Sequence, residues 1–423
     1  MKYFNIYYIC LISAFFSVYL ILKDGVIIDF DTISYVKAWN SFSSGEIDLW
    51  RTPTYPLFLG ILMWCFGKQF MLAAIIIQFA TFLVSIYYFY KTGISIIDNK
   101  TCVIAITIFY ALFPCISTWN NYILTESFAV YALIFTLYYL TKAYIDNSNR
   151  YHIHLFFCIL FLVFLRPAII FIIPILFFIL CILGIKTSWG KNIRIGLINL
   201  IIICFFLGGY TYLYYKKYGI LSPTAVGVLN NYYIARMDGI LKPEMANNKE
   251  LSLYIERSIS KHGVRYANGS GFDLGREGIT AIHNYGPKAV SDLISKSDFN
   301  SISNRTKRFL QHLRKASQDK LFSTYNIRWN YISDITCLKI NALYIMLFIY
   351  TIVLSYWTFK RKILAWFSFL LLLLGTGHLF VILYSCQNVW YRLIIPFTPV
   401  YLLMIGQLCS LLEVKETDKQ FLK

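Results

Sequence analysis

The chain has 423 residues, of which 58% are hydrophobic, 18% aromatic and only 14% charged, and its mean hydropathy is +0.58. Globular domains in water are about half apolar and about a quarter charged, so this composition excludes an ordinary soluble enzyme, a disordered chain and a fibrous protein. The formal net charge of +18 comes from Lys and Arg residues that lie mostly between apolar segments. That placement indicates membrane topology and lipid headgroups as their role, and it argues against nucleic acid as a partner.

Apolar segments that are long enough to cross a bilayer recur along the chain. Segments such as 69–90 and 338–359 are apolar on every face, which excludes the alternating strands of an outer-membrane barrel. We predict an all-α polytopic membrane protein with about ten transmembrane helices, each about 18 or more residues long. The expected spans are 5–23, 69–90, 101–117, 126–143, 151–166, 167–185, 196–215, 338–359, 363–383 and 393–412.

The number of spans depends on how two apolar segments are interpreted. The segment 151–185 is too long for one span, and it carries Arg166 followed by Pro167. Pro is a poor interior helix residue and Arg is costly inside a membrane, so we expect a break there with Arg166 at an interface. The apolar segment 53–67 is short for a span and contains two prolines, which favours a re-entrant or interfacial helix.

The distribution of basic residues predicts the topology. If 53–67 does not cross, one side of the membrane carries Lys2, Lys91, Lys100, Arg150, Lys186, Lys191, Arg194, Lys360, Arg361, Lys362, Lys415, Lys419 and Lys423. That side is cytoplasmic, together with both termini. The segments expected outside are 24–68, 118–125, 216–337 and 384–392.

These spans divide the chain into three parts. Residues 1–215 form an N-terminal transmembrane catalytic module that includes the first outer loop, and residues 216–337 form a mainly helical periplasmic insert. Residues 338–423 form the C-terminal transmembrane helices and a short tail. Within the insert we expect helices at 246–261, 286–297 and 300–322, and a Gly-rich turn region at 268–275.

Polar residues of the outer segments are the candidates for chemistry. Asp29 and Asp31 follow the first span, and Asp31 lies four residues before Tyr35, on the same face if the segment is helical. Arg51 and Tyr55 flank the entry to the short helix at 53–67.

Three further charged residues are expected on the same face. Glu126 begins the fourth span, where the helix dipole favours a carboxylate. Arg166 lies at the expected break, and Tyr391 and Arg392 begin the last span. Paired carboxylates can deprotonate a hydroxyl or hold a divalent metal, and Arg side chains bind phosphate bidentately. A site built from both, at a membrane surface, suits a phosphate-bearing lipid substrate.

Other kinds of site have no support in the sequence. The six His residues show no metal-ligand spacing, and there is no P-loop, no GxGxxG after a strand and no GxSxG. His378, inside the ninth expected span, is either a packed histidine or a site residue.

In these loops the chain resembles the GT-C membrane glycosyltransferases. The similarity is greatest to the polyprenyl-phosphate-sugar-dependent branch with the protein O-mannosyltransferases and the aminoarabinose transferases. It lies in Asp31 with Tyr35, in "RTPTYPLFL" (Arg51, Tyr55), in "ILTES" (Glu126), in "LRP" (Arg166), and in "YRLIIPFTP" (Tyr391, Arg392).

The resemblance implies an inverting glycosyltransferase of the bacterial inner membrane. It would transfer a sugar from a polyprenyl-phosphate donor to a glycan, lipid or protein acceptor at the outer face. It implies Asp31 as catalytic base and Glu126 as its partner, and Arg51 and Arg392 as ligands of the donor phosphate. The family often has two adjacent acidic residues in this loop, whereas Phe30 separates Asp29 from Asp31 here, so the choice of base stays open. No nucleotide site is needed, because the donor supplies the energy. A divalent metal ion is the one cofactor left open, and Asp31 and Glu126 are the residues that would hold it.

Two other functions fit the same pattern of spans. A surface-polysaccharide polymerase or ligase also has many spans and one long outer loop, and it would depend on Arg and His residues of the insert. A transporter or flippase of lipid-linked substrates typically shows inverted repeats and polar residues near the midplane, which this sequence does not show clearly.

Overall fold

The computed structural model describes residues 6–146, 148–186, 189–266, 271–321, 338–361, 366–385 and 390–413. Within these ranges the regular structure is helical, and β pairing is limited to two isolated bridges, Ile27 with Tyr122 and Lys320 with Lys339. Among the residues that the structure describes, eight helical segments are long and apolar enough to cross a membrane, or nine if one bent pair counts as a span. The chain is therefore an all-helical, multi-pass membrane protein.

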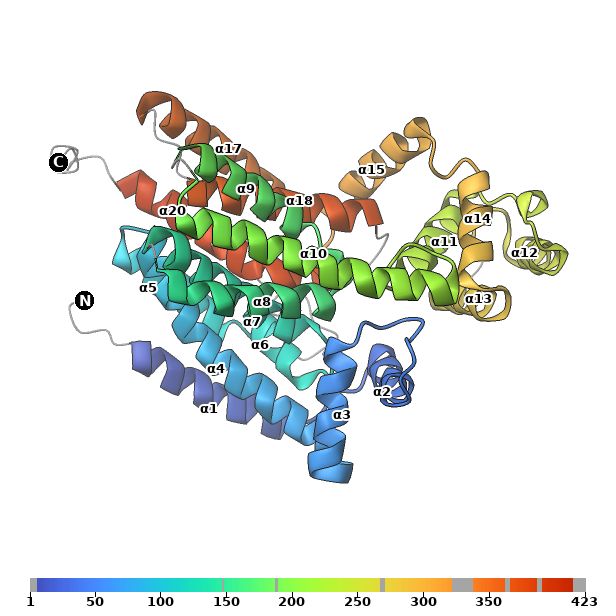
Figure 1. Ribbon diagram of the computed structural model, residues 1–423, viewed down its shortest axis with the longest axis horizontal. Coiled ribbons are helices and arrows are strands. Elements are labelled where there is room, and N and C mark those ends of the chain that lie inside the picture. The colour runs from blue at the N-terminus through green and yellow to red at the C-terminus, as the bar shows by residue number, and fades with distance from the viewer. Residues whose placement is uncertain are drawn as a thin grey trace.

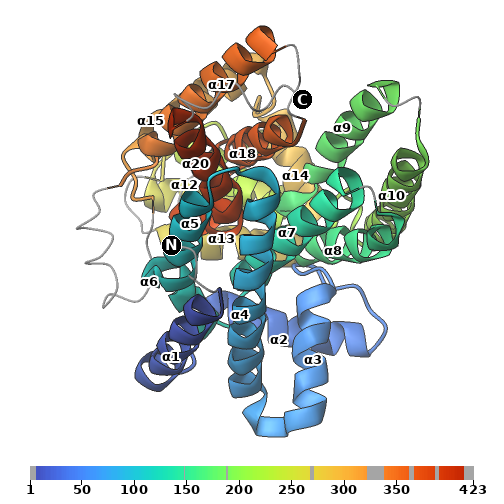
Figure 2. The ribbon, with the colours of Figure 1, turned by 90° about the vertical axis from the view of Figure 1, so that its left-hand side faces the viewer.

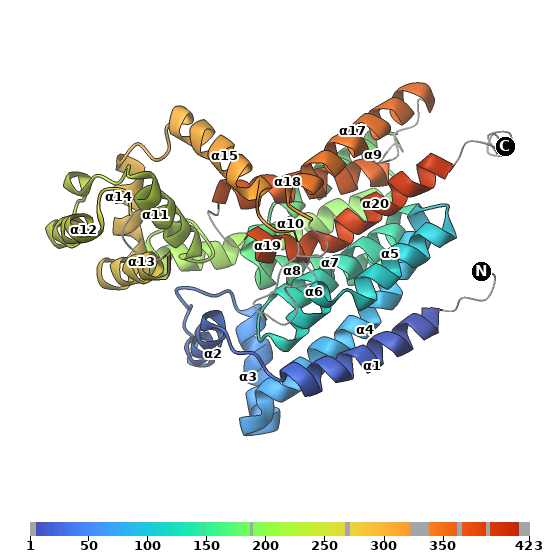
Figure 3. The same ribbon diagram turned by 180° about the vertical axis from the view of Figure 1, so that it is seen from behind.

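The apolar helices form one bundle, and α1 begins and α20 ends at the end of the bundle opposite to the hydrophilic insert (Figures 1 and 3). We call the other end the insert end. Figure 2, which views the bundle from the opposite end, shows α1, α9, α10 and α17 around its rim. The two most enclosed spans begin at Glu126 and Trp390. The helices of the bundle are α1 (Ile6–Asp24), α4 (Phe70–Ile96), α5 (Lys100–Leu112), α7 (Glu126–Leu140), α8 (His152–Leu165), α9 (Ile172–Lys186), α10 (Lys191–Tyr218), α17 (Asn341–Arg361), α18 (Trp366–Ser385), α19 (Trp390–Ile394) and α20 (Thr398–Glu413).

The expected break at Arg166 and Pro167 is confirmed. Helix α8 ends at Leu165, Arg166 is extended with φ −144° and ψ 95°, and α9 begins after a short 3-10 turn. The expected span 101–117 is not straight, because the chain bends by 54° between α5 and the short helix α6 (Pro114–Ser117). Pro114 causes this bend, since proline cannot donate the backbone hydrogen bond that would continue α5.

The first loop at the insert end contains two helices. Helix α2 (Phe30–Ser43) carries Asp31, and α3 (Thr54–Phe66) runs across the ends of α1 and α4 (Figures 1 and 3). The two helices approach closely at Gly60, where a Cβ atom would lie 2.2 Å from the Trp39 ring. A side chain at position 60 would therefore separate α2 from α3 and displace the segment between them.

The insert has its own hydrophobic core, separate from that of the bundle. Its helices are α11 (Val226–Asp238), α12 (Lys249–His262), α13 (Gly271–Tyr285), α14 (Pro287–Lys296) and α15 (Ile302–Ser317). The core also holds Tyr214 of α10, and Leu49 and Trp50 of the first loop pack against it. The insert is thereby fixed to the loop that carries Asp31 and Arg51.

One expectation for the insert is wrong. Of the Gly-rich region expected as a turn at 268–275, residues 271–275 are helical within α13, and residues 268–270 lie outside the described part of the chain. Buried Leu274, Ala281 and Ile282 repeat at a helical spacing, so packing overrides the low helix propensity of the glycines. Gly278 also permits close packing, because a Cβ atom there would lie 2.6 Å from Leu229 on α11.

Candidate functional site

Three carboxylates and three guanidinium groups from five separate segments meet at the insert end of the bundle. Arg392 on α19 is their centre. Its Nη2 lies 2.6 Å from Asp31 Oδ2, its Nε lies 2.5 Å from Glu126 Oε1, and its Nη1 lies 3.6 Å from Asp29 Oδ2. One side chain thus joins the first loop at the insert end to the start of α7, although Asp31 and Arg392 are 361 positions apart in the sequence. The carboxylates of residues 31 and 126 consequently lie at the same end of the bundle.

Arg51 holds the other oxygen of Asp31. Its Nη2 lies 2.6 Å from Asp31 Oδ1, Nη1 donates to the Tyr35 hydroxyl at 3.1 Å, and Nε donates to Ser34 Oγ at 2.9 Å. The guanidinium carbon also lies 4.2 Å from the centre of the Tyr35 ring, a distance suited to a cation–π contact. Asp31 is therefore clamped between two arginines, yet its side chain remains 29% exposed.

Glu126 is the buried member of the cluster, with 1% of its surface exposed. Arg166 Nη1 lies 3.3 Å from Oε1, the same oxygen that accepts from Arg392. Oε2 of Glu126 and Nη1 of Arg166 have no hydrogen-bond partner among the described residues. Buried polar atoms without a partner are rare and costly, so they mark a place where a ligand group or water can bind.

The arginines determine the ionisation of Asp31. Burial alone would raise the pKa of its carboxyl, but the Arg51 and Arg392 guanidiniums outweigh burial and hold the pKa well below its usual range. Asp31 is thus a carboxylate at any physiological pH. With three Arg and three acidic side chains, the cluster has a formal net charge of zero.

Local sequence explains how these groups are presented. Asp29 is the N-cap of α2, because its Oδ1 accepts from the backbone N–H of Phe30 and its backbone N–H donates to the Thr32 hydroxyl. The capping arrangement begins the helix at Phe30 and so fixes where Asp31 and Tyr35 lie, one turn apart. Glu126 is the first residue of α7.

Two predicted binding residues lie outside the cluster. Tyr55 is 1% exposed, its ring packs edge-on against Tyr35, and its hydroxyl donates to Gln78 Oε1 at 3.1 Å. Tyr55 therefore packs against Tyr35, and its burial keeps its side chain from contacting a substrate. Tyr391 precedes Arg392 on α19 and packs partly against the bundle core.

His378 is a packed histidine. Its Nε2 donates to the Leu393 carbonyl at 3.1 Å, and its Nδ1 lies 3.2 Å from the Tyr401 hydroxyl. Its ring stacks on Phe397 with centroids 3.9 Å apart. It holds the segment that follows Arg392 rather than facing the carboxylates.

The sequence did not single out Gln78, which positions the loop before Glu126. Its Nε2 donates to the carbonyls of Asn120 and Tyr122 at 2.8 and 2.9 Å. The available signal was an isolated glutamine within the apolar span 69–90, because a buried amide needs hydrogen-bond partners. Ser34, which accepts from Arg51, was also missed.

In the part of the chain that the structure describes, no group of three or more His, Cys, Asp or Glu side chains is arranged to hold a metal ion. Asp31 and Glu126 were the residues expected to do so. Their oxygens Asp31 Oδ1, Asp31 Oδ2 and Glu126 Oε1 all face arginines. This donor set therefore does not fit a cation, and no metal enters the chemistry derived below.

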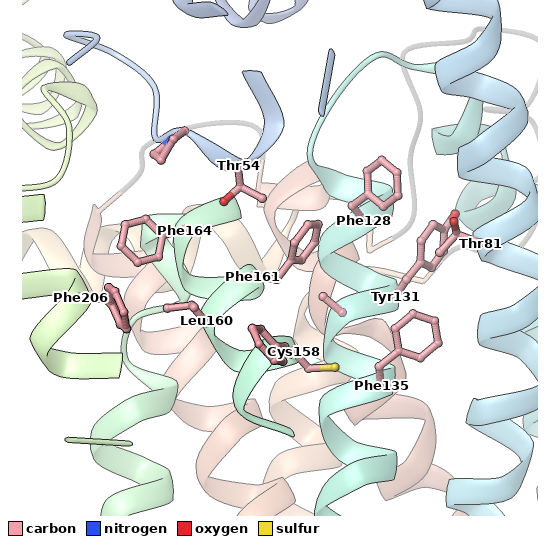
Figure 4. A pocket seen from close by; sticks show the side chains of 13 residues that line it. Thr54, Thr81, Phe128, Tyr131, Phe135, Cys158, Leu160, Phe161, Phe164 and Phe206 are labelled. Carbon is pink, nitrogen blue, oxygen red and sulfur yellow. The ribbon is translucent and has the colours of Figure 1, made fainter. Parts of the chain in front are cut away.

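An apolar groove of about 680 Å³ lies among the helices of the bundle. It is lined by side chains of α3, α4, α7, α8 and α10, and Figure 4 shows aromatic rings on both sides of it, with Thr54 at one end. Three lining residues are close in sequence to members of the cluster: Pro53 lies two residues from Arg51, Phe128 two from Glu126 and Phe164 two from Arg166. The full lining is Pro53, Thr54, Thr81, Phe128, Tyr131, Ala132, Phe135, Phe157, Cys158, Leu160, Phe161, Phe164 and Phe206.

Comparison with models of known protein families finds no match, and comparison with curated proteins finds no significant match either. The site itself is therefore the basis for assigning a function.

Proposed function

We propose that the protein is an inverting glycosyltransferase that takes a sugar from a polyprenyl-phosphate donor at the outer face of a bacterial inner membrane. The observation that carries the proposal is the meeting of Asp31, Glu126, Arg51 and Arg392 in one cluster. The protein also has an apolar groove whose lining includes Pro53 and Phe128, each two residues from a member of the cluster. Guanidinium groups suit a phosphate, carboxylates suit an acceptor hydroxyl, and the groove suits a hydrocarbon chain. A lipid-phosphate sugar combines these three chemistries in one molecule.

The donor phosphate would bind by exchanging partners with Asp31. Arg51 and Arg392 each place an Nη2 atom 2.6 Å from one Asp31 oxygen. The cluster is already neutral, so an added phosphate anion competes with Asp31 for these guanidiniums. Exchange would hold the phosphate where negative charge develops during the reaction and would free Asp31 from part of its clamp.

A freed Asp31 becomes a more effective base, because its pKa rises once an arginine turns to the phosphate. The acceptor hydroxyl then loses its proton to Asp31, and its oxygen bonds to the anomeric carbon. The bond from that carbon to the phosphate oxygen breaks, and the polyprenyl phosphate leaves with the electron pair. Attack opposite the leaving group inverts the configuration of the anomeric carbon.

We favour Asp31 over Asp29 as the base. Asp29 is committed to capping α2, and it lies 3.6 Å from Arg392 as against 2.6 Å for Asp31. Glu126 is too buried to act as the base toward a bulky acceptor. Its charge also holds Arg392 and Arg166 in place.

The proposal includes the topology. The shorter apolar segment Asn149–Leu165 and the bent pair beginning at Lys100 would complete ten spans with the eight candidates. Helix α3, which exposes Trp64, Ile61 and Phe66, would then lie in the outer membrane interface. The acceptor and the sugar stay open.

The test is turnover in proteoliposomes with a synthetic polyprenyl-monophosphate sugar. Wild-type protein should release polyprenyl phosphate, and Asp31→Asn should reduce the rate by about 10²–10⁴-fold while inserting normally. Glu46→Gln is a matched control, because Glu46 lies in the same loop but pairs with exposed Lys217. Turnover of a diphosphate-linked oligosaccharide in place of the monophosphate would instead support a polysaccharide polymerase.

A further inference from the structure

Helix α15 carries more of the excess positive charge of the insert than any other of its helices, because it holds five Lys and Arg residues and no Asp or Glu. Residues 219–298 contain nine Lys and Arg and eight Asp and Glu, so they are close to neutral. Residues 299–321 contain six Lys and Arg and one acidic residue, Asp319. The segregation of charge onto one helix is not needed for the fold, because the other insert helices pack with balanced charge.

The buried face of α15 is held by contacts to the insert and by contacts to the bundle. Arg308 Nη2 donates to the Phe299 carbonyl at 3.2 Å, and its guanidinium lies over the Phe299 ring. One turn later, His312 Nδ1 donates to the Leu383 carbonyl of α18 at 2.7 Å. Arg308, His312 and Ala316 are buried and lie on one side of the helix. The opposite side of α15 therefore has a fixed direction in space.

The opposite face combines basic and apolar side chains. Lys307, Leu310 and Arg314 are exposed and follow one another at helical spacing, with Leu310 57% exposed. Within the described ranges no carboxylate pairs with Lys307 or Arg314. A leucine between two long cations is the pattern of helices that lie in the headgroup region of a bilayer.

The position of α15 in the molecule agrees with that pattern. It runs from the insert back to the bundle, beside the insert end of α18 (Figures 1 and 3). Its last turns contact Leu383 near the end of α18, and the Tyr344 hydroxyl near the start of α17 donates to the Leu313 carbonyl at 3.3 Å. Both contacts lie where the two spans leave the apolar region, which is the level of the lipid headgroups.

We infer that the exposed face of α15, formed by Lys307, Leu310 and Arg314, is a docking surface for anionic phospholipid headgroups. The cations neutralise lipid phosphates while Leu310 enters the boundary between headgroups and acyl chains. This contact holds the insert at a set height above the membrane. The inference depends on the multi-pass architecture and not on the proposed transferase activity.

Hydrogen exchange of the full chain in nanodiscs tests the inference. Nanodiscs of phosphatidylcholine alone are compared with nanodiscs that also contain phosphatidylglycerol. The anionic lipid should slow exchange of the α15 amides by about tenfold or more, and high salt should reverse the effect. Exchange in α12, which lies farther from the bundle and has mixed charge, should not change (Figure 1).

Variants that remove two cations from either α15 or α12 distinguish a specific contact between α15 and anionic lipid from a general effect of the protein's positive charge. The double variant Lys307→Gln, Arg314→Gln should abolish the lipid-dependent protection of α15. The double variant Arg257→Gln, Lys261→Gln, which removes two exposed cations of α12, should leave it intact. Equal exchange of α15 in both lipids would overturn the inference, and so would protection produced only by a soluble anionic polysaccharide.

Discussion

The Arg236 cluster of the insert and the Arg392 cluster of the bundle both pair arginine with carboxylate, and they differ in how completely their polar atoms are hydrogen-bonded. In the insert, Arg236 is fully buried and its Nε lies 3.0 Å from Glu277 Oε1. Its Nη1 donates to the Val264 carbonyl and its Nη2 to Ser258 Oγ. Tyr232 and Ser258 donate to Glu277. In this cluster the Arg236 and Glu277 side chains are fully satisfied by neighbours within the insert.

The cluster around Arg392 has the opposite properties. Its members come from distant segments, Asp31 is partly exposed, and Glu126 Oε2 and Arg166 Nη1 lack hydrogen-bond partners in the described part of the chain. Three of the groove's lining residues, Pro53, Phe128 and Phe164, each lie two positions from a member of this cluster in the sequence. A satisfied ion pair holds a scaffold together, whereas an unsatisfied one beside a cavity is suited to a ligand.

Removing the central arginine of each cluster should separate these roles most strongly. Arg236→Met leaves Glu277 buried without its cation, so we expect a loss of about 3–5 kcal/mol of stability and little change in turnover per folded molecule. Arg392→Met should lower turnover by about 10²–10³-fold, because phosphate charge is no longer stabilised. Thermal unfolding and turnover are measured on both variants. The same pattern of effects in the two variants would contradict the comparison.

Filling the groove should affect the site but not the insert. Ala132 lies on α7 among the lining residues, so Ala132→Trp should raise KM for a long-chain donor by about tenfold and leave a short-chain donor nearly unaffected. Ile352→Trp on α17, an exposed apolar position outside the lining, is the control. If the KM of Ala132→Trp does not depend on the chain length of the donor, the groove does not bind the donor's hydrocarbon chain.

Asp29 and Asp31, the two carboxylates of the first loop, should differ in how strongly their substitution lowers turnover. Asp29→Asn retains a capping side chain, so we expect less than about 1 kcal/mol of lost stability and a change in turnover of only a few-fold. A loss of turnover as large as that of Asp31→Asn would assign the base to Asp29. Comparing the two variants in one turnover assay answers the question that the sequence left open.

The smallest expected effect is a pH dependence at the junction of insert and bundle. Burial lowers the pKa of His312, whose neutral ring donates to Leu383 and whose charged neighbours are Asp238, Arg308 and Lys315. When α15 separates from α18, His312 is exposed to water and its pKa is near 6.5. Below about pH 6.5 the separated state therefore binds more protons than the packed state, so the contact between α15 and α18 weakens as the pH falls.

Hydrogen exchange of α15 at about pH 5 and pH 7, corrected for intrinsic rates, measures this effect. Exchange should be faster at the lower pH. His312→Gln should remove the difference, because an amide does not titrate in this range. A difference that persists in His312→Gln would assign the pH dependence to another group.

Much of the bundle could be predicted from the sequence, because the length of an apolar segment is a local property of the chain. The unfavourable free energies of an arginine within a membrane and a proline within a helix, at Arg166 and Pro167, are local as well. The shared side of Asp31, Glu126 and Arg392 followed from the positive-inside rule alone. The bend at Pro114 and the helix from Gly271 did not follow, because each depends on a balance between local propensity and packing. The roles of Gln78 and Tyr55 also depend on tertiary contacts.

The pairing within the site could not be predicted either. Sequence placed charges of both signs at one end of the bundle but gave no reason for Arg392 to contact three carboxylates at once. The groove arises from the spacing of α7 and α8 against α3, and no single segment encodes that spacing.

A structure of the full chain in a nanodisc with undecaprenyl monophosphate tests the central claim most directly. The account predicts the phosphate against Arg51 and Arg392, with Asp31 released from at least one of them and the first prenyl units in the groove beside Phe128 and Phe161. A phosphate bound elsewhere, with both arginines still paired to Asp31, would contradict it.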